Sequence, residues 1–183
     1  MKKETAKNII HTEYHENGQL KHEVKFENFK IKAKDTWMNE FRWKQTWWFD
    51  NGQIEKVANY VNDKRDGKWF AWYWHGRIKT KVNYKNGNLE GRQTEYFENG
   101  QKKSECNFIN NLPDGNQILF YESGKKKACE HITIRKGPIA EIKMTKWYEN
   151  GQKKEEGTWW GVKKKGKWTE WYENGQIKEE NNY

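Results

Sequence analysis

Histidine and carboxylate side chains gather near the start of the sequence in a pattern that could hold a metal ion. His11, His15 and His22 are expected on one face of the first hairpin, with Glu13 directly opposite His22. Three imidazoles and a carboxylate form a ligand set that zinc accepts. The diagonal spacing between such residues on paired strands is roughly 7 Å, however, which is wide for one metal. We therefore interpret this group as a terminal cap and assign no metal and no cofactor.

The other acidic residues repeat with the turns of the chain rather than gathering at one place. Paired acid and base groups of an enzyme would occur once, in a cleft. The glycine-lysine pairs also lie in hairpin loops without a following helix, so they do not form a nucleotide-binding loop. The sequence therefore predicts a protein without catalytic activity. The repeated carboxylates are Glu16, Asp50, Glu98, Glu122, Glu149 and Glu173.

Aromatic and basic residues recur at fixed distances from a repeated glycine and form the strongest candidate binding surface. An aromatic residue stands four positions before each glycine: Tyr14, Trp48, Trp72, Tyr96, Phe120, Trp147 and Trp171. A lysine stands three positions after six of the seven glycines: Lys21, Lys79, Lys103, Lys127, Lys154 and Lys178. A ring facing an alkyl stem and ammonium is a favourable cross-strand pair, worth ~0.5–1 kcal/mol when exposed. We expect a ring–lysine ladder that faces solvent.

The elements that position these side chains follow from a repeat of 24 residues. Asn-Gly or a close variant recurs, and a second glycine lies 15 residues later in four repeats. Asn-Gly between aromatic-rich runs predicts a hairpin with a two-residue type I′ turn, in which both residues have positive φ. The second loop, such as 62–67, is expected to be longer and looser. The first-turn glycines are Gly18, Gly52, Gly76, Gly100, Gly124, Gly151 and Gly175.

These hairpins predict an all-β, repetitive antiparallel meander of about fourteen strands in about seven units, forming an elongated twisted or curved sheet. In a two-residue hairpin the residue three before the glycine pairs with the one two after it. One face then carries large rings alternating with small residues, such as Val24, Ala58 and Gly157, and should be packed. The opposite face carries the ring–lysine ladder. We expect a single array over residues 1–183, with an irregular insertion at about 27–45 and an irregular fifth unit at about 129–146.

Composition sets the limits of this fold. The 183 residues carry a formal charge of +9, with hydrophobic residues at only 33% but 29 aromatic residues, so any core is built from rings. No stretch is long and apolar enough to span a membrane. Polar residues follow the first methionine, and there are two cysteines. These features predict a cytoplasmic protein with free thiols.

The segment from Tyr172 to Lys178, with 66–69 as its second-half counterpart, resembles MORN-type repeats of the bacterial variant class. Proteins built mainly of this variant are often grouped as YwqK-type components of toxin–antitoxin or toxin–immunity pairs. The resemblance covers about Tyr14 to Tyr183. It implies a curved antiparallel sheet used for protein contact, and for some members an affinity for anionic phospholipid. The chain departs from the pattern at 27–45 and at 129–146.

Function is expected to be protein binding, with a cognate toxin as the partner that the resemblance implies. The interface is expected on the ring–lysine ladder or on the irregular stretch 27–45, which holds Trp37 and Trp43. The alternative is peripheral binding of anionic lipid or nucleic acid, because basic and aromatic residues alternate on the same strands. Interspersed acidic residues count against nucleic acid. A third alternative is self-association into a homodimer through open sheet edges.

Overall fold

The computed structural model describes the backbone of residues 10–33, 36–134 and 140–183, and the side chains of 11–26, 41–132 and 141–183. The chain divides into two compact units, Met1–Gly91 (unit 1) and Arg92–Tyr183 (unit 2). Sixteen strands lie in the described residues, and every described pair is antiparallel. The chain is therefore all-β, as predicted. That the repeats form one domain stays a prediction.

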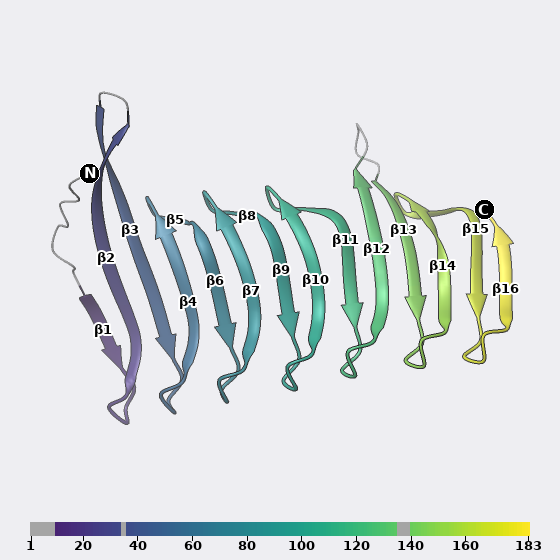
Figure 1. Cartoon of the computed structure of the whole chain (residues 1–183), viewed down its shortest axis with the longest axis horizontal. Coiled ribbons are helices and arrows are strands. Elements are labelled where there is room, and N and C mark those ends of the chain that lie inside the picture. Colours follow the sequence, from purple (N-terminus) through teal and green to yellow (C-terminus); the bar gives the residue numbers. More distant parts are fainter. Residues whose placement is uncertain (1–9, 34–35, 135–139) are drawn as a thin grey trace. The chain divides into compact units, whose positions relative to one another are not determined.

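Unit 1 is a meander in which strands follow one another in chain order (Figure 1). The order is β1-β2-β3-β4-β6-β7, and the short strands β5 and β8 pair with β4 and β7. Its strands are β1 (Ile10–Tyr14), β2 (Leu20–Ala33), β3 (Thr36–Trp48), β4 (Ile54–Val61), β5 (Lys64–Arg65), β6 (Gly67–Trp72), β7 (Ile78–Lys85) and β8 (Asn88–Leu89).

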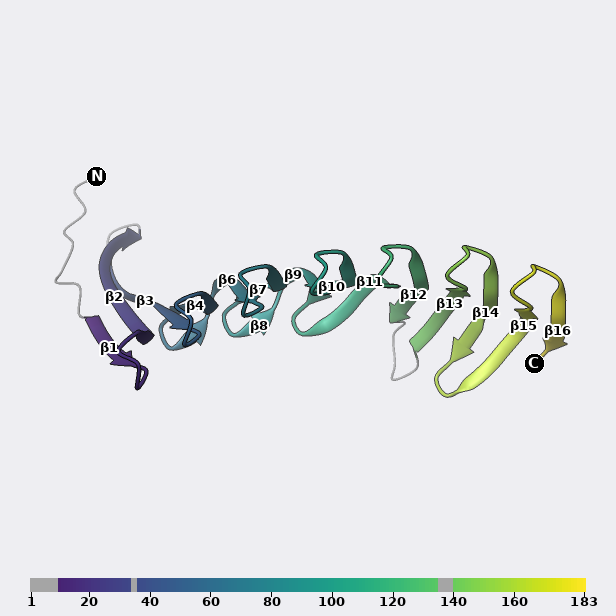
Figure 2. The ribbon, with the colours of Figure 1, turned by 90° about the horizontal axis from the view of Figure 1, so that it is seen from below.

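Unit 2 repeats the same plan, with strands in the order β9 to β16. They are β9 (Gly91–Tyr96), β10 (Lys102–Ile109), β11 (Leu112–Phe120), β12 (Lys126–Ile134), β13 (Ala140–Trp147), β14 (Lys153–Trp160), β15 (Lys163–Trp171) and β16 (Ile177–Asn182). Seven hairpins result, each with its Asn-Gly-type turn on the same edge of its unit (Figure 1). Each unit is one open layer of strands (Figure 2). Both the number of units and the meander agree with the sequence prediction.

The Asn-Gly turns differ from the predicted type I′ geometry. In the first repeat Gly18 N donates to His15 O at 2.9 Å and His15 N donates to Gln19 O at 2.8 Å. Gly18 has a φ of 81°, whereas Asn17 does not have a positive φ. This is a three-residue loop: a type I turn followed by a left-handed glycine. The same pair of backbone bonds closes all seven turns.

The two-residue type I′ turn occurs instead at the second loop, which was predicted to be long and loose. Asn62 and Asp63 have φ values of 47° and 62°, and they connect the paired residues Val61 and Lys64. Asn86–Gly87 and Asn110–Asn111 have positive φ at both residues in the same way. Asparagine, aspartate and glycine tolerate this conformation best, which explains the composition of these loops.

The three-residue loop changes the register close to each turn. Trp48 pairs with Ile54, while Trp47 pairs with Lys56, so Glu55 is left as a β-bulge without a Cα partner. Beyond the bulge the pairs follow the predicted register, as for Glu13 opposite His22. The predicted pairing is therefore right in the body of the strands and wrong by one residue next to the turn. The bulge compensates for the odd number of loop residues.

Buried residues lie on both faces of each unit. Strand alternation places Val24 and Ala58 on one face, named here the valine face, and both are buried as predicted. Thr46 and Val57 pair on the opposite face, named the threonine face, and are buried as well. Thr94 and Thr169 are also buried in unit 2. The expectation that one face is packed and the other only faces solvent is therefore wrong, because cross-strand neighbours cover the middle of both faces.

The irregular insertion at 27–45 is an extension of a hairpin rather than a separate loop. β2 and β3 are 14 and 13 residues long, and their pairing continues without a shift from His22↔Trp47 to Ala33↔Thr36. The fifth unit keeps its two strands, β12 and β13, paired from Ala128↔Lys146 to Ile134↔Ala140. The loop between them, at 135–139, lies outside the described residues.

Candidate functional site

The predicted ring row occupies equivalent positions in both units. Each ring is the last residue of its strand, directly before a turn, and all except Tyr14 are half-buried. Unit 1 holds Tyr14, Trp48 and Trp72, and unit 2 holds Tyr96, Phe120, Trp147 and Trp171. In unit 1, Thr46 alternates with Trp48 along β3, so the ring row belongs to the threonine face.

Most of the predicted lysines do not stand across from these rings. Lys79, Lys127 and Lys154 are bulge residues without Cα partners. Their ammonium groups lie over the ring three positions before the glycine, one residue later than predicted. Lys79 Nζ is 5.5 Å from the centroid of Tyr73, Lys127 Nζ is 5.6 Å from Tyr121, and Lys154 Nζ is 5.3 Å from Tyr148.

Two other predicted lysines behave differently. Lys178 is also a bulge residue, and its Nζ donates to Glu170 Oε2 at 3.2 Å. This hydrogen bond and the carboxylate charge raise the pKa of the Lys178 ammonium. Lys103 is exposed. The ring–lysine contacts thus exist, but the bulge directs them to a different row of rings.

The rings three positions before the glycine also link successive hairpins. Tyr121 Oη donates to Trp147 O at 2.8 Å, and Tyr148 Oη donates to Trp171 O at 2.9 Å. His15 Nε2 lies 3.0 Å from Trp48 O in the same arrangement. Burial, followed by the nearby Glu149 and Glu173 carboxylates, raises the pKa of the Tyr121 phenol. These side chains hold one strand pair against the next.

The turns themselves form a second ladder. Asn51 Nδ2 donates to Trp74 O in the next turn at 2.8 Å, while its Oδ1 accepts from Gln53 N at 3.0 Å. Asn17, Asn99 and Asn150 bond to the following turn in the same way. The Gln53 side chain lies close to Gly76, where a Cβ would come within 2.9 Å of its Oε1. The turn residues therefore stack the repeats rather than form a binding site.

Trp43, predicted as part of the partner surface, is packed within a stack of rings. Its ring centroid is 3.9 Å from that of Tyr60 and 5.9 Å from that of Phe26. The indole Nε1 is buried and has no hydrogen-bond partner. Trp37 pairs with Lys32 on the extended hairpin, and its side chain lies outside the described residues.

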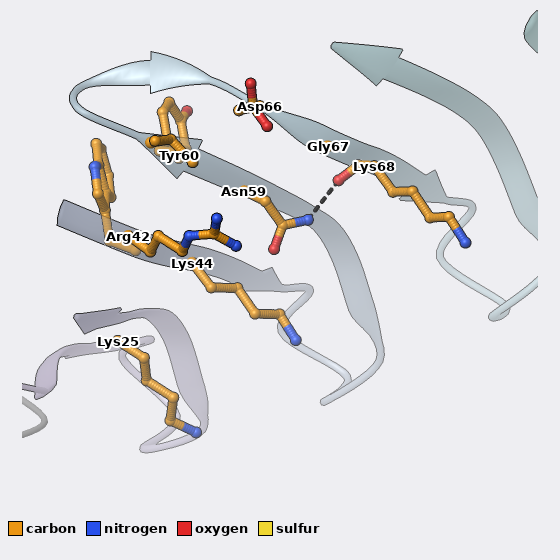
Figure 3. A pocket seen from close by; sticks show the side chains of 10 residues that line it. Lys25, Arg42, Lys44, Asn59, Tyr60, Asp66, Gly67 and Lys68 are labelled. Carbon is orange, nitrogen blue, oxygen red and sulfur yellow. Dashed lines mark hydrogen bonds between the residues drawn. The ribbon is translucent and has the colours of Figure 1, made fainter. Parts of the chain in front are cut away.

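A basic groove of about 500 Å³ lies beside this stack in unit 1 (Figure 3). Lys25, Lys44 and Lys68 extend in the same direction from β2, β3 and β6. Asn59 Nδ2 donates to Lys68 O at 2.6 Å and forms the floor between them. Arg42, Tyr60 and Asp66 also line the groove. Because Lys44 and Trp48 share one face of β3, the threonine face of unit 1 has an aromatic zone near the turns and a cationic zone beyond it.

The sequence pattern next to the turns does not predict this groove. Its cations come from three separate strands, and only the pairing of β2 with β3, of β3 with β4 and of β4 with β6 brings them together. A signal was nevertheless present, because Lys44 and Lys68 both stand eight residues before a turn glycine.

The histidine group remains loosely arranged. His11 Nε2 lies 3.5 Å and His22 Nδ1 4.0 Å from Glu13 Oε1, and the two imidazole centroids are 6.4 Å apart. His15 instead contacts Trp48 O. Within the described residues, no group of three or more His, Cys, Asp or Glu side chains has the geometry of a metal site.

The repeat pattern matches a known family. Residues 7–28, 44–62, 89–110, 140–160 and 164–183 match the MORN repeat variant. These segments include more than half of the chain. The chain belongs to the MORN repeat variant family. The unmatched parts of this MORN chain include most of the extended hairpin, the third turn at Trp74–Gly76 and the irregular fifth unit as far as residue 139.

Other comparisons add less to this MORN assignment. No curated protein matches the chain. A chain in the crystal structure of TcdB2-TccC3-Cdc42 matches over 94% of this chain, with 9% identity and a TM-score of 0.26. The match covers 11% of that chain, so this MORN protein spans about one tenth of its length. At this TM-score the likeness supports no conclusion about function. No helix in the described part of the chain could cross a membrane.

Proposed function

We propose that this MORN repeat protein is a non-enzymatic scaffold that binds a protein partner through the threonine face of unit 1. One observation carries the proposal: half-buried Trp48 and Trp72 share this face with the exposed cations Lys44 and Lys68, and no second layer formed by the described residues covers it. Tryptophan in the centre of an interface with charged residues at the rim is the usual composition of a binding hot spot. Repeats of this family generally mediate protein binding.

The specific form of the proposal is an antitoxin or immunity protein that neutralises a cognate toxin. It is supported by the resemblance of the repeated Tyr-Glu-Asn-Gly-Gln segment to YwqK-type components. The cytoplasm is the compartment that we propose, because Cys106 and Cys129 are both free thiols. A scaffold of this kind inhibits by covering its partner and needs no chemistry of its own.

Co-expression with the product of the adjacent gene tests this proposal. We expect that product to reduce growth when expressed alone, growth to recover when the MORN protein is present, and the two proteins to co-purify. Trp72→Ala should weaken co-purification by about tenfold or more. Tyr172→Ala is the matched control, because Tyr172 is exposed and outside the ring row. The proposal would be contradicted if the MORN protein did not restore growth. It would also be contradicted if the Trp72→Ala and Tyr172→Ala variants co-purified equally well with the partner.

An anionic polymer or lipid surface is the second candidate ligand. The exposed bulge lysines, among them Lys79 and Lys127, favour it, as does the exposed Lys103. Binding driven by phosphate contacts weakens by orders of magnitude between low and moderate salt, whereas burial of aromatic side chains is much less sensitive. Sub-micromolar binding to anionic liposomes or oligonucleotides in physiological salt would support this candidate over a protein partner.

A further inference from the structure

An ion pair recurs within the repeats of unit 2. It joins a basic residue eight positions before the turn glycine to a glutamate five positions after it. Arg92 contacts Glu105 in this way, and Lys167 Nζ lies 3.0 Å from Glu180 Oε2. The two positions lie on neighbouring strands, and in these two of the four unit 2 repeats the cation is neutralised within its own repeat. A carboxylate is therefore a ligand that this position can receive.

Two repeats of unit 1 keep the cation but lack the glutamate. The residue five positions after the glycine is Val57 in the repeat of Lys44 and Lys81 in the repeat of Lys68. Among the described residues, no carboxylate lies within ion-pair distance of either Lys44 or Lys68. Unit 1 therefore presents two cations without the carboxylate that Arg92 and Lys167 have.

The arrangement of neighbouring groups increases this charge imbalance. Lys25 stands directly opposite Lys44 on the adjacent strand, and like charges in this position repel each other. Lys25 has Glu23 as a partner at 2.8 Å, so only one carboxylate serves this pair of lysines. An external anion in the groove would reduce the repulsion and satisfy both unpaired cations.

The geometry of the groove fits side chains of an extended acidic segment. Lys44 lies on β3 and Lys68 on β6, with β4 between them. Two strand spacings separate their backbones by about 10 Å. Residues three apart in an extended chain are separated by about the same distance. Two acidic residues at this spacing could reach both ammonium groups at once.

We infer that the groove binds an acidic segment of the partner protein, whose carboxylates take the place that Glu105 and Glu180 hold in unit 2 and that Val57 and Lys81 hold in unit 1. This inference rests on the proposed function, because it assigns the chemistry of the partner at the proposed interface. Carboxylate is favoured over phosphate because glutamate is the group that occupies the equivalent place beside Arg92 and Lys167. The groove thus selects its partner by charge, while the aromatic zone supplies apolar contact.

Fluorescence anisotropy with a labelled oligo-glutamate peptide tests the inference on the full chain. A peptide of about eight residues is long enough to span the groove. We expect it to bind at low salt and an oligo-glutamine peptide not to bind. Lys44→Gln with Lys68→Gln should weaken binding about tenfold. Val57→Glu with Lys81→Glu should weaken peptide binding at least as much. This variant supplies internal counter-ions for Lys44 and Lys68 while both lysines remain.

Matched controls separate a local effect from a change in net charge. Lys143→Gln with Lys167→Gln removes the same charge at equivalent positions of unit 2. Val162→Glu with Lys125→Glu changes the net charge as much as Val57→Glu with Lys81→Glu does. Val162 and Lys125 are both exposed. Both should leave peptide binding within about twofold. The glutamine variant tests the inference even where Val57→Glu disturbs folding, because Lys44 and Lys68 are exposed.

Three outcomes would overturn the inference. The first is equal peptide binding by the wild type and the Lys44/Lys68 glutamine variant. The second is an equal loss in the unit 2 control. The third is tighter binding of an oligothymidylate than of the oligo-glutamate peptide with the same number of charges, provided that this binding depends on Lys44 and Lys68. If a captured partner binds the wild type and the glutamine variant equally, the protein-binding function stands and the assignment of the groove fails.

Discussion

The indole of Trp168 lies directly against the backbone of Gly157 on the neighbouring strand. A Cβ added to Gly157 would be 2.0 Å from Trp168 Cε3 and 2.4 Å from Cδ2. Trp168 is only 2% exposed, and Trp159 contacts its ring edge to face at a centroid distance of 5.3 Å. Lys164 Nζ lies 4.2 Å from the same ring. The absence of a side chain at Gly157 is therefore what lets unit 2 bury its largest side chain.

Gly157→Ala should destabilise unit 2 by about 1–3 kcal/mol, because the methyl group would overlap a large, rigid ring. Urea unfolding followed by tryptophan fluorescence measures the change. Combined with Trp168→Leu, the same substitution should cost less than it does alone, since the smaller side chain leaves space for the methyl group. If the two substitutions had additive effects on the free energy of unfolding, overlap with the Trp168 ring would not be the cause of the destabilisation.

Asn150→Ala should lower the free energy of unfolding more than Asn174→Ala does. Asn150 Nδ2 donates to Glu173 O in the next turn at 2.8 Å, whereas within the described residues Asn174 bonds only in its own turn, to Gln176. One neutral hydrogen bond contributes about 1 kcal/mol, which sets the expected difference. Denaturant titration of the two variants measures it. Equal losses would mean that the bonds between turns add no stability.

Tyr121→Phe should change how stability depends on alkaline pH. The pKa of this phenol is raised above its ordinary value of 10.0. The phenol therefore contributes its full stabilisation of the folded state below pH 10.0, and this stabilisation is lost as the pH rises through the higher folded-state pKa. The wild type should therefore lose more stability above pH 10.0 than the variant does. At neutral pH the variant should be less stable by about 1 kcal/mol, because the hydrogen bond to Trp147 O is absent. Thermal unfolding across this range tests both effects.

The matched control for this experiment is Tyr172→Phe. Tyr172 is 52% exposed, so removal of its hydroxyl should change the free energy of unfolding at neutral pH by less than about 0.5 kcal/mol. An identical profile for Tyr121→Phe and the wild type would contradict the proposed role of the buried phenol.

Asp63→Ala should destabilise unit 1 by about 1 kcal/mol, whereas Asp63→Gly should not. Asp63 has a φ of 62°, where the Cβ of alanine is strained and glycine is not. The equivalent turn at Asn86–Gly87 already has glycine at this place. Equilibrium unfolding of the two variants compares them directly. A glycine variant less stable than the alanine variant would show that the aspartate side chain matters more than the backbone conformation.

Several features of the fold could be predicted because they depend on local sequence. The repeated glycines indicated seven reversals, and the aromatic-rich runs between them indicated strands. Pairing in the body of each hairpin, such as Glu13 opposite His22, followed from these two facts. The exchange of turn types could not be predicted in this way. Both kinds of loop contain asparagine and glycine, and the choice depends on how the three-residue loop and the bulge at Glu55 together maintain the register.

The candidate site likewise combines features that the sequence predicts with features that only the fold decides. Sequence alone determined which residues repeat, and so placed Trp48 and Trp72 at equivalent strand ends on one face. Tertiary structure decided which lysines have partners: the bulge directed Lys79 to Tyr73, and strand pairing placed Lys25 opposite Lys44 beside a strand that carries Val57 instead of glutamate. The physical reason is that a repeat is a local property of the chain. The balance of charge on a surface depends on residues far apart in sequence that only strand pairing brings within reach of each other.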